Sequence, residues 1–177
     1  MNLQSNDFEL FGLAPRFAQD RSAIDARWKD LQREAHPDKF ATRGAAAQRV
    51  AMQWSVRINE AYQRLKDGLK RAAYLCELHG EPVNAENNTA MATEFLLQQM
   101  AWREALEEAQ GAAELAQLAA QVASAKREAL QQCEQLLDQQ QDYHGAVQKV
   151  RALMFMERFA RDVEARLDRL DDADRGQ

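Results

Sequence analysis

Apolar side chains recur along this chain at the spacing of an α-helix. Between residues 20 and 35 they are Ile24, Trp28, Leu31 and Ala35. A longer stripe reaches about residue 66 and consists of Ala47, Val50, Trp54, Ile58, Ala61 and Leu65. Residues three or four apart share one face of a helix, so the spacing predicts two amphipathic helices. Joined by a short loop, two such helices pack their stripes together as an antiparallel pair.

Helical patterns also occupy the rest of the chain. A short one before the pair contains Phe8, Leu10, Phe11 and Leu13. The later ones cover residues 69–78, 91–109, 112–140 and 142–170. No stretch alternates apolar and polar residues in the manner of a β-strand. We therefore expect an all-α protein.

Turn-forming residues divide these helices into two units. Gly80 ends the fourth helical pattern and is followed by a proline and a polar stretch, which marks a domain boundary. We expect an N-terminal domain at residues 1–80, in which short helices flank the antiparallel pair, and a linker at residues 81–89. A three-helix bundle at residues 90–172 and a frayed tail at residues 173–177 complete the chain.

The loop between the paired helices carries the tripeptide His36, Pro37 and Asp38. Pro37 ends the first helix, because it has no N–H to donate and disfavours helical backbone at the residue before it. An antiparallel pair leaves this loop exposed at one end. The tripeptide is either a functional loop or an ordinary turn in which Asp38 accepts backbone hydrogen bonds.

Basic residues surround this loop. On a helical wheel Lys29 and Arg33 lie opposite the apolar face of the first paired helix, Arg27 lies on its flank, and Lys39 follows the tripeptide. The net charge is −5, yet residues 1–81 carry +2, because 13 Lys and Arg stand against 11 Asp and Glu. The acidic total argues against nucleic acid as the main ligand. The cationic face suits an acidic protein surface.

The first helix of the expected bundle has two apolar faces. One is the expected core contact and consists of Phe95, Trp102 and Leu106, flanked by Ala105 and Ala109. The opposite face is surplus to the core and consists of Leu96, Leu97 and Met100. Glu104 and Glu107 border it, and an apolar centre with an acidic rim is typical of a protein-binding site. Alternatively, a neighbouring element such as the N-terminal domain covers this face.

Composition limits the classes of protein that remain. Hydrophobic residues make up 46% of the 177 residues, which is enough for a globular core. No apolar run approaches the roughly 20 residues that span a bilayer, and the first residues lack the pattern of a secretory signal. We expect a cytoplasmic protein. Cys76 and Cys133 each lie in an apolar helical pattern and are expected to be buried thiols.

Two segments together resemble a J-domain, the module that activates ATP-dependent chaperones of the DnaK class. One is the cationic helix that ends in the tripeptide, and the other is the segment Ile58-Asn59-Glu60-Ala61-Tyr62 in the second paired helix. Many J-domains have an aromatic residue before the histidine, whereas this chain has Ala35. Some packing under the loop is therefore absent or supplied by Phe40.

Three pieces further resemble the HscB family of iron–sulfur cluster co-chaperones. They are the tripeptide loop, the Arg-Ala-x-Tyr-Leu core of residues 69–80, and the helix of residues 94–97 that leads to Arg103 and Glu104. This resemblance implies two partners, an HscA-type ATPase chaperone and the IscU-type scaffold on which the cluster is assembled. It implies no catalytic residue and no resident cofactor or metal, and we expect a monomer.

The same resemblance implies which residues bind each partner. The residues implied to bind the chaperone are Arg27, Lys29, Arg33, His36, Pro37, Asp38 and Lys39. The residues implied to bind the scaffold are Leu96, Leu97, Met100, Glu104 and Phe155. By its spacing alone, Phe155 in the last helix indicates only a wide core face.

Three other functions compete with this interpretation. An enzyme would use His36 and Asp38 as an acid–base pair, but the sequence has no glycine-rich phosphate loop, metal-ligand cluster or activated nucleophile. A J-domain protein with a different client in general protein folding would not need the apolar face around Leu97. A passive helical adaptor would not need His36.

Overall fold

The computed structural model describes residues 2–84 and 91–175, which are almost entirely helical and contain no β-strand. The all-α prediction is confirmed. The α-helices are α1 (Asp7–Phe11), α2 (Arg21–Ala35), α3 (Ala45–Lys66), α4 (Gly68–Leu78), α5 (Thr93–Glu108), α6 (Ala112–Glu134) and α7 (Tyr143–Arg175). A 3₁₀-helix, η1 (Pro37–Arg43), and a π-helical turn, η2 (Gln135–Gln139), follow α2 and α6. None of these helices is apolar enough over a sufficient length to cross a membrane.

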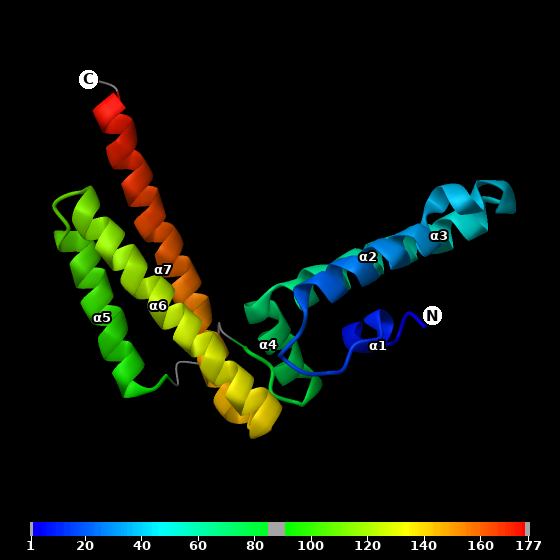
Figure 1. The fold of residues 1–177 in the computed structure, drawn as a ribbon, viewed down its shortest axis with the longest axis horizontal. Coiled ribbons are helices and arrows are strands. Elements are labelled where there is room, and N and C mark those ends of the chain that lie inside the picture. Colours follow the sequence, from blue (N-terminus) through cyan, green and yellow to red (C-terminus); the bar gives the residue numbers. More distant parts are fainter. Residues whose placement is uncertain (1, 85–90, 176–177) are drawn as a thin grey trace.

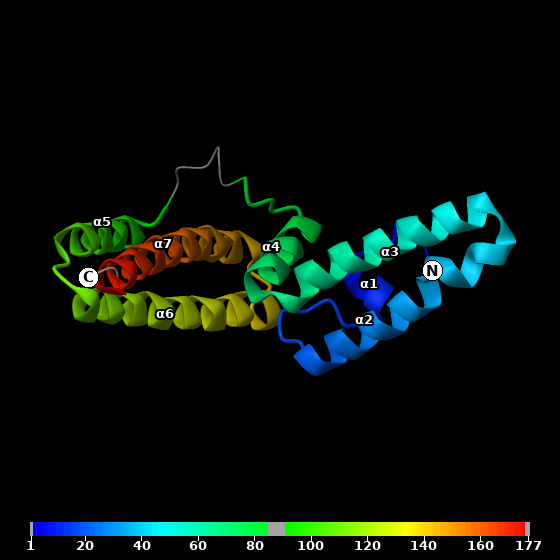
Figure 2. The ribbon, with the colours of Figure 1, turned by 90° about the horizontal axis from the view of Figure 1, so that it is seen from above.

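The elements form two bodies that lie end to end (Figures 1 and 2). The α2–α3 hairpin, with α1 against it, makes one body, and α5, α6 and α7 make the other. Helix α4 lies between them. The tip of the hairpin, which carries the tripeptide, therefore lies at the opposite end of the molecule from the C-terminus.

Side-chain caps and local backbone explain where several helices begin and end. Asn6 and Glu9 form a reciprocal capping box at the start of α1, and Gly12 ends this helix with a φ of 66°. Asp20 caps α2 by accepting the backbone N–H of Ser22 at 2.9 Å. At the other end of the chain, α7 continues to Arg175, beyond the end expected at residue 170.

A hydrophobic core joins α4 to the helices of the N-terminal body, which are α1, α2 and α3. Its largest buried side chains are Phe8, Phe11, Ile24, Leu31, Ile58, Leu65 and Leu75. Asp7 is also fully buried, and its carboxylate lies 2.7 Å from Arg57 Nη1 and 2.6 Å from Arg64 Nε. The backbone N–H of Asp7 donates to the hydroxyl of Tyr74 at 3.0 Å. These contacts hold the short helix α1 against both α3 and α4.

The expected packing of the α3 stripe is wrong at its N-terminal end. Val50 is 49% exposed, and Ala47 and Trp54 are only half-buried. The reason is length, because the 15 residues of α2 span about 22 Å and the 22 residues of α3 about 33 Å. The first turns of α3 thus extend past Ala35 and face only η1. None of the residues of η1 is buried.

The second body is built on α6 and α7, which supply most of its core. Leu115, Val122, Cys133, Val147, Leu153 and Phe159 are all fully buried. Helix α5 joins them through Trp102, whose ring stacks on Phe159 with 5.7 Å between centroids. Ala109 is buried as expected, but Ala105 is exposed. The predicted three-helix bundle is confirmed.

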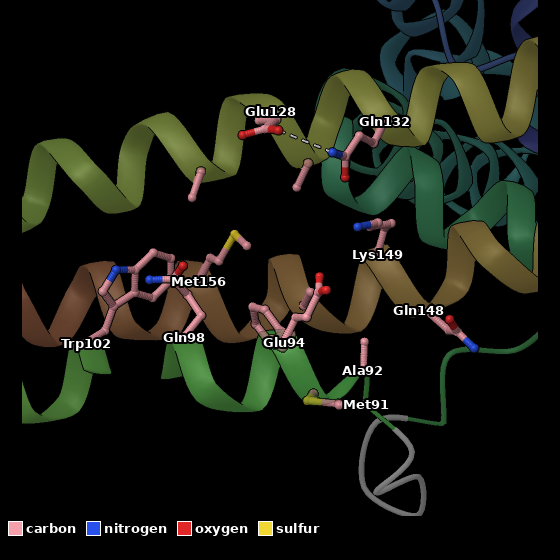
Figure 3. A pocket seen from close by; sticks show the side chains of 14 residues that line it. Met91, Ala92, Glu94, Gln98, Trp102, Glu128, Gln132, Gln148, Lys149 and Met156 are labelled. Carbon is pink, nitrogen blue, oxygen red and sulfur yellow. Dashed lines mark hydrogen bonds between the residues drawn. The ribbon is translucent and has the colours of Figure 1, made fainter. Parts of the chain in front are cut away.

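A cleft of about 340 Å³ separates the N-terminal half of α5 from α6 and α7 (Figure 3). Three alanines of α6 and α7 line it, Ala125, Ala129 and Ala152, and they are too short to fill the space. Trp102 and the hydrogen-bonded pair Glu128 and Gln132 are drawn around the cleft in Figure 3. The inner face of α5 is therefore incompletely packed.

The junction between the two bodies contains polar and aromatic contacts. Asp138, in the π-helical turn, accepts the backbone N–H groups of Phe17 at 2.7 Å and Ala18 at 2.8 Å. The rings of His79 and Tyr143 stack with 3.8 Å between centroids. These contacts join segments more than 60 residues apart and hold the two bodies against each other.

The two cysteines lie at the same junction. Cys76 of α4 and Cys133 of α6 are fully buried free thiols, which confirms the expectation for both. Burial raises the pKa of Cys76 to about 11 and that of Cys133 to about 12. Neither thiol is therefore ionised near neutral pH.

The first residues after the boundary expected at residue 80 contact the bundle. Arg151 of α7 donates to the carbonyl oxygen of Val83 at 2.8 Å, so the first residues of the expected linker are held on the bundle. Residues 85–89 of that linker lie outside the described residues, as do residues 176 and 177 of the expected tail. The domain limits stay a prediction.

Candidate functional site

The tripeptide lies at the exposed tip of the hairpin. His36 ends α2 in an extended conformation, with φ −62° and ψ 126°, and Pro37 begins the 3₁₀-helix. His36 Nδ1 accepts the backbone N–H of Asp38 at 3.3 Å and lies 3.6 Å from a carboxylate oxygen of the same residue. The side chain of His36 is 57% exposed and that of Asp38 is 91% exposed. Both side chains are therefore available to a partner.

This geometry does not favour acid–base catalysis. A catalytic pair is normally held in a pocket that excludes water, whereas His36 and Asp38 are open to solvent. Within residues 2–84 and 91–175 there is also no cluster of His, Cys, Asp or Glu placed to hold a metal ion.

Three of the predicted chaperone-binding residues meet around one shallow pocket. Arg33, His36 and Lys39 line a volume of about 300 Å³ together with Gln32. Each of the three can donate a hydrogen bond, and two carry a permanent positive charge. Their polar ends can pair with a carboxylate of a partner protein, whereas the wall of the pocket itself is almost entirely apolar.

The cationic face of α2 is less uniform than the sequence predicts. Arg33 pairs with Asp30 on the same helix, and Arg27, which is half-buried, reaches Glu34 at 4.0 Å. Lys29 is exposed and forms no ion pair with any described residue. Exposed ion pairs contribute little stability, so Arg33 can exchange Asp30 for a partner's carboxylate.

A network of side chains fixes α2 on α3 behind the tripeptide. Asn59 Oδ1 accepts hydrogen bonds from Trp28 Nε1 at 2.9 Å and from Gln32 Nε2 at 2.8 Å. The ring of Tyr62 stacks on Trp28 with 4.7 Å between centroids, and its hydroxyl donates to Asp25 at 2.9 Å. The sequence comparison with J-domains singles out Asn59 and Tyr62 but not their partners on α2. Periodicity does not identify which polar groups meet across two helices.

The second candidate surface is the outer face of α5. Leu96 is 41% exposed, Leu97 60% and Met100 67%. Glu104 and Glu107 are also exposed. The expectation that the three apolar side chains point away from the core is confirmed, and no described element covers them. Their binding role stays a prediction.

Phe155 belongs to an aromatic cluster beneath α5. Its ring meets Phe95 edge to face at 5.7 Å and stacks on Phe159 at 5.8 Å. The guanidinium carbon of Arg103 lies 5.4 Å from the centre of the same ring. Phe155 is half-buried, so it supports the exposed face of α5 more than it extends that face.

Comparison with known proteins gives closely similar sequences. Residues 91–164 match the family model described as the HSCB C-terminal oligomerisation domain. The co-chaperone protein HscB homolog of Burkholderia mallei (strain SAVP1) is 47% identical over 174 residues, which cover 97% of this chain and 99% of that protein. That of Burkholderia cenocepacia is 45% identical over the same shares of the two chains.

The solved structures that resemble this one are also of HscB proteins. Chaperone HscB from Vibrio cholerae has a TM-score of 0.80 and 35% identity, and the match covers 94% of this chain and 99% of that chain. Human co-chaperone HscB, at 23% identity, has a TM-score of 0.88 over 94% of this chain and 84% of that chain, and shows the shared fold alone. On the sequence identities over nearly its full length, this chain belongs to the HscB family of co-chaperones.

Proposed function

We propose that this chain stimulates the ATPase of an HscA-type chaperone of the DnaK class and delivers the IscU-type iron–sulfur scaffold to it. The observation that carries this proposal is the exposure of two surfaces of different chemistry on two separate bodies. One is the polar tip around His36 and Asp38, and the other is the apolar face around Leu97 and Met100.

The tip is the proposed contact with the chaperone. A carboxylate of the chaperone would pair with the exposed charged ends of Arg33 and Lys39, while Asp38 faces a basic group. Stimulation requires that these contacts be stronger in the hydrolysing state of the chaperone than in its resting state. No proton transfer by His36 is needed.

The outer face of α5 is the proposed contact with the scaffold. Leu96, Leu97 and Met100 form an apolar centre, and Glu104 lies one turn beyond Met100 at its edge. Well-buried apolar anchors inside a polar rim supply most of the affinity of a protein interface. We include Phe155 as support for this face.

The junction makes the two contacts act together. While one body holds the chaperone and the other holds the scaffold, the scaffold is present at a high effective concentration beside the chaperone. In this arrangement residues 1–80 act as the J-domain and residues 90–172 as the scaffold-binding domain. We place the complex in the cytoplasm, where the ATP that drives the chaperone is found.

A second use of the α5 face is self-association, which the description of the matched family model favours. A dimer formed through Leu97 and Met100 would compete with scaffold binding. Sedimentation of the chain alone and with the scaffold separates the two uses, and we expect a monomer that forms a one-to-one complex.

The test is steady-state ATP hydrolysis by the cognate HscA-type chaperone. This chain and the scaffold are added singly and together, for the wild type, Asp38→Asn, and the triple variant Leu96→Ala, Leu97→Ala and Met100→Ala. We expect Asp38→Asn to abolish stimulation and the triple variant to abolish only the joint effect. Stimulation that survives Asp38→Asn would overturn the J-domain assignment. A triple variant with a normal joint effect would show that the client is bound elsewhere or is a different protein.

A further inference from the structure

An apolar groove lies directly beneath the tripeptide. It measures about 460 Å³ and is enclosed by the last turn of α2, the 3₁₀-helix and the first turns of α3. Its apolar lining includes Ala35, Phe40, Ala47, Val50, Ala51 and Trp54. The groove exists because α3 extends past the end of α2, so its apolar stripe has no helix to pack against.

The chemistry of the groove is that of an unfilled core. Ala35 is 4% exposed and Ala51 3% exposed, so these two small side chains form its floor. Val50 stands at its edge, 49% exposed. Protein interiors are normally filled to crystal-like density, and apolar surface left open in this way marks a site of interaction.

The position of the groove identifies its occupant. Ala35 immediately precedes His36, and Phe40 immediately follows Lys39, so a protein that contacts the tripeptide also borders the groove. The guanidinium of Arg43 lies over the ring of Phe40 at 5.5 Å and adds positive charge to the rim.

Charge further restricts the occupant. The one acidic residue in the lining, Glu34, is reached by Arg27 at 4.0 Å. Because Arg27 balances Glu34, the remaining charge at the rim is that of Arg43, and it favours apolar side chains that have acidic neighbours. A second copy of this chain is a poorer fit, because a stable dimer buries at least about 1,200 Å² and the groove occupies only the narrow tip of a hairpin.

We propose that this groove receives apolar side chains of the ATPase chaperone, flanked by acidic residues, and that Ala35 and Val50 select for them. The inference rests on the proposed function, since it adds a second, apolar contact to the polar contact of the tripeptide. The small side chain at position 35 leaves the space open, and Val50 provides the edge against which the incoming side chains pack.

The test uses the full chain and the cognate HscA-type chaperone, and measures the concentration of this chain that gives half-maximal ATPase stimulation. Ala35→Phe fills the groove from its floor, and we expect this concentration to rise at least about fivefold while the Tm is kept or raised. Val50→Ser removes apolar surface from the edge, and a rise of about three- to tenfold is expected. Met52→Ser is the matched control, since Met52 is 56% exposed on the same helix but outside the groove, and it should stay within about twofold of the wild type.

Two results would overturn the inference. One is a folded Ala35→Phe with wild-type half-maximal concentration, and the other is a Val50→Ser that behaves like Met52→Ser. A change in sedimentation of the chain alone, with stimulation unaffected, would assign the groove to a second copy and would also overturn it. Asp38→Asn separates this failure from that of the proposed function. If only the groove inference is wrong, this variant still abolishes ATPase stimulation.

Discussion

The carboxylate of Asp138 joins the two bodies of the molecule, and we expect Asp138→Asn to weaken their junction. One carboxylate oxygen accepts the backbone N–H of Phe17 at 2.7 Å, and the other accepts that of Ala18 at 2.8 Å. An asparagine has a single acceptor oxygen. One of the two backbone N–H groups would therefore face an amide NH₂ group, which can only donate.

The magnitude follows from these two hydrogen bonds. One charge-assisted bond, worth about 1.5–3 kcal/mol, is lost, and the other becomes a neutral bond worth about 1 kcal/mol. Asp138 is half-buried, so water restores part of the loss. We expect the free energy of unfolding to fall by about 2 kcal/mol, which lowers the Tm of a chain of this size by about 4–8 °C.

Thermal denaturation followed by circular dichroism measures this loss. Asp142→Asn is the matched control, because Asp142 accepts only one backbone N–H, that of Gly145 at 2.9 Å, and asparagine serves equally well in this capping position. We expect the control to change the free energy of unfolding by less than about 0.5 kcal/mol.

The same variant links the junction to activity. In the ATPase assay Asp138→Asn should keep the stimulation given by this chain alone and lose part of the joint effect with the scaffold, because the two binding surfaces are no longer held at a fixed separation. Equal Tm values for Asp138→Asn and Asp142→Asn would refute the reasoning, since they would mean that the second hydrogen bond contributes nothing.

Four further outcomes follow from buried groups. Asp7→Asn should lower the free energy of unfolding in urea by about 3 kcal/mol, because two arginines lose a fully buried carboxylate. The control Asp30→Asn, in an exposed ion pair, should lower it by less than about 0.5 kcal/mol, and equal losses would contradict the prediction. Since burial raises the pKa of Cys76 to about 11 and of Cys133 to about 12, both thiols should resist a thiol reagent at pH 8 until the chain unfolds. Rapid labelling of the folded chain would contradict the burial of these thiols. The contribution of the two thiols to the free energy of unfolding should be complete below about pH 9. It should decline as the pH rises towards 11, because the thiols of the unfolded chain lose their protons at a lower pH. Ala129→Leu should fill part of the cleft beside α5 and raise the free energy of unfolding by about 0.5–2 kcal/mol, and a destabilised variant would mean that the cleft cannot hold the added atoms.

Features that depend on neighbours in the chain follow from the sequence alone. Each α-helix and the stop at Pro37 are predictable, because helix periodicity, capping and proline geometry act over a few residues, whereas the 3₁₀-helix after His36 lies where the pattern predicts a loop. The outward direction of Leu97 and Met100 is predictable for the same reason, since helical spacing separates them from the core face that contains Trp102.

Features that depend on partners distant in the chain come only from the folded structure. The sequence pattern includes Val50 in the packed stripe. In the structure Val50 is exposed, because α2 ends before it can cover this part of α3. The hydrogen bonds of Asp138 to residues 17 and 18 cross some 120 positions of the chain, and no local pattern contains them. Periodicity determines which face of a helix is apolar, whereas packing against other elements decides which part of that face is covered, because burial is a property of the assembled molecule.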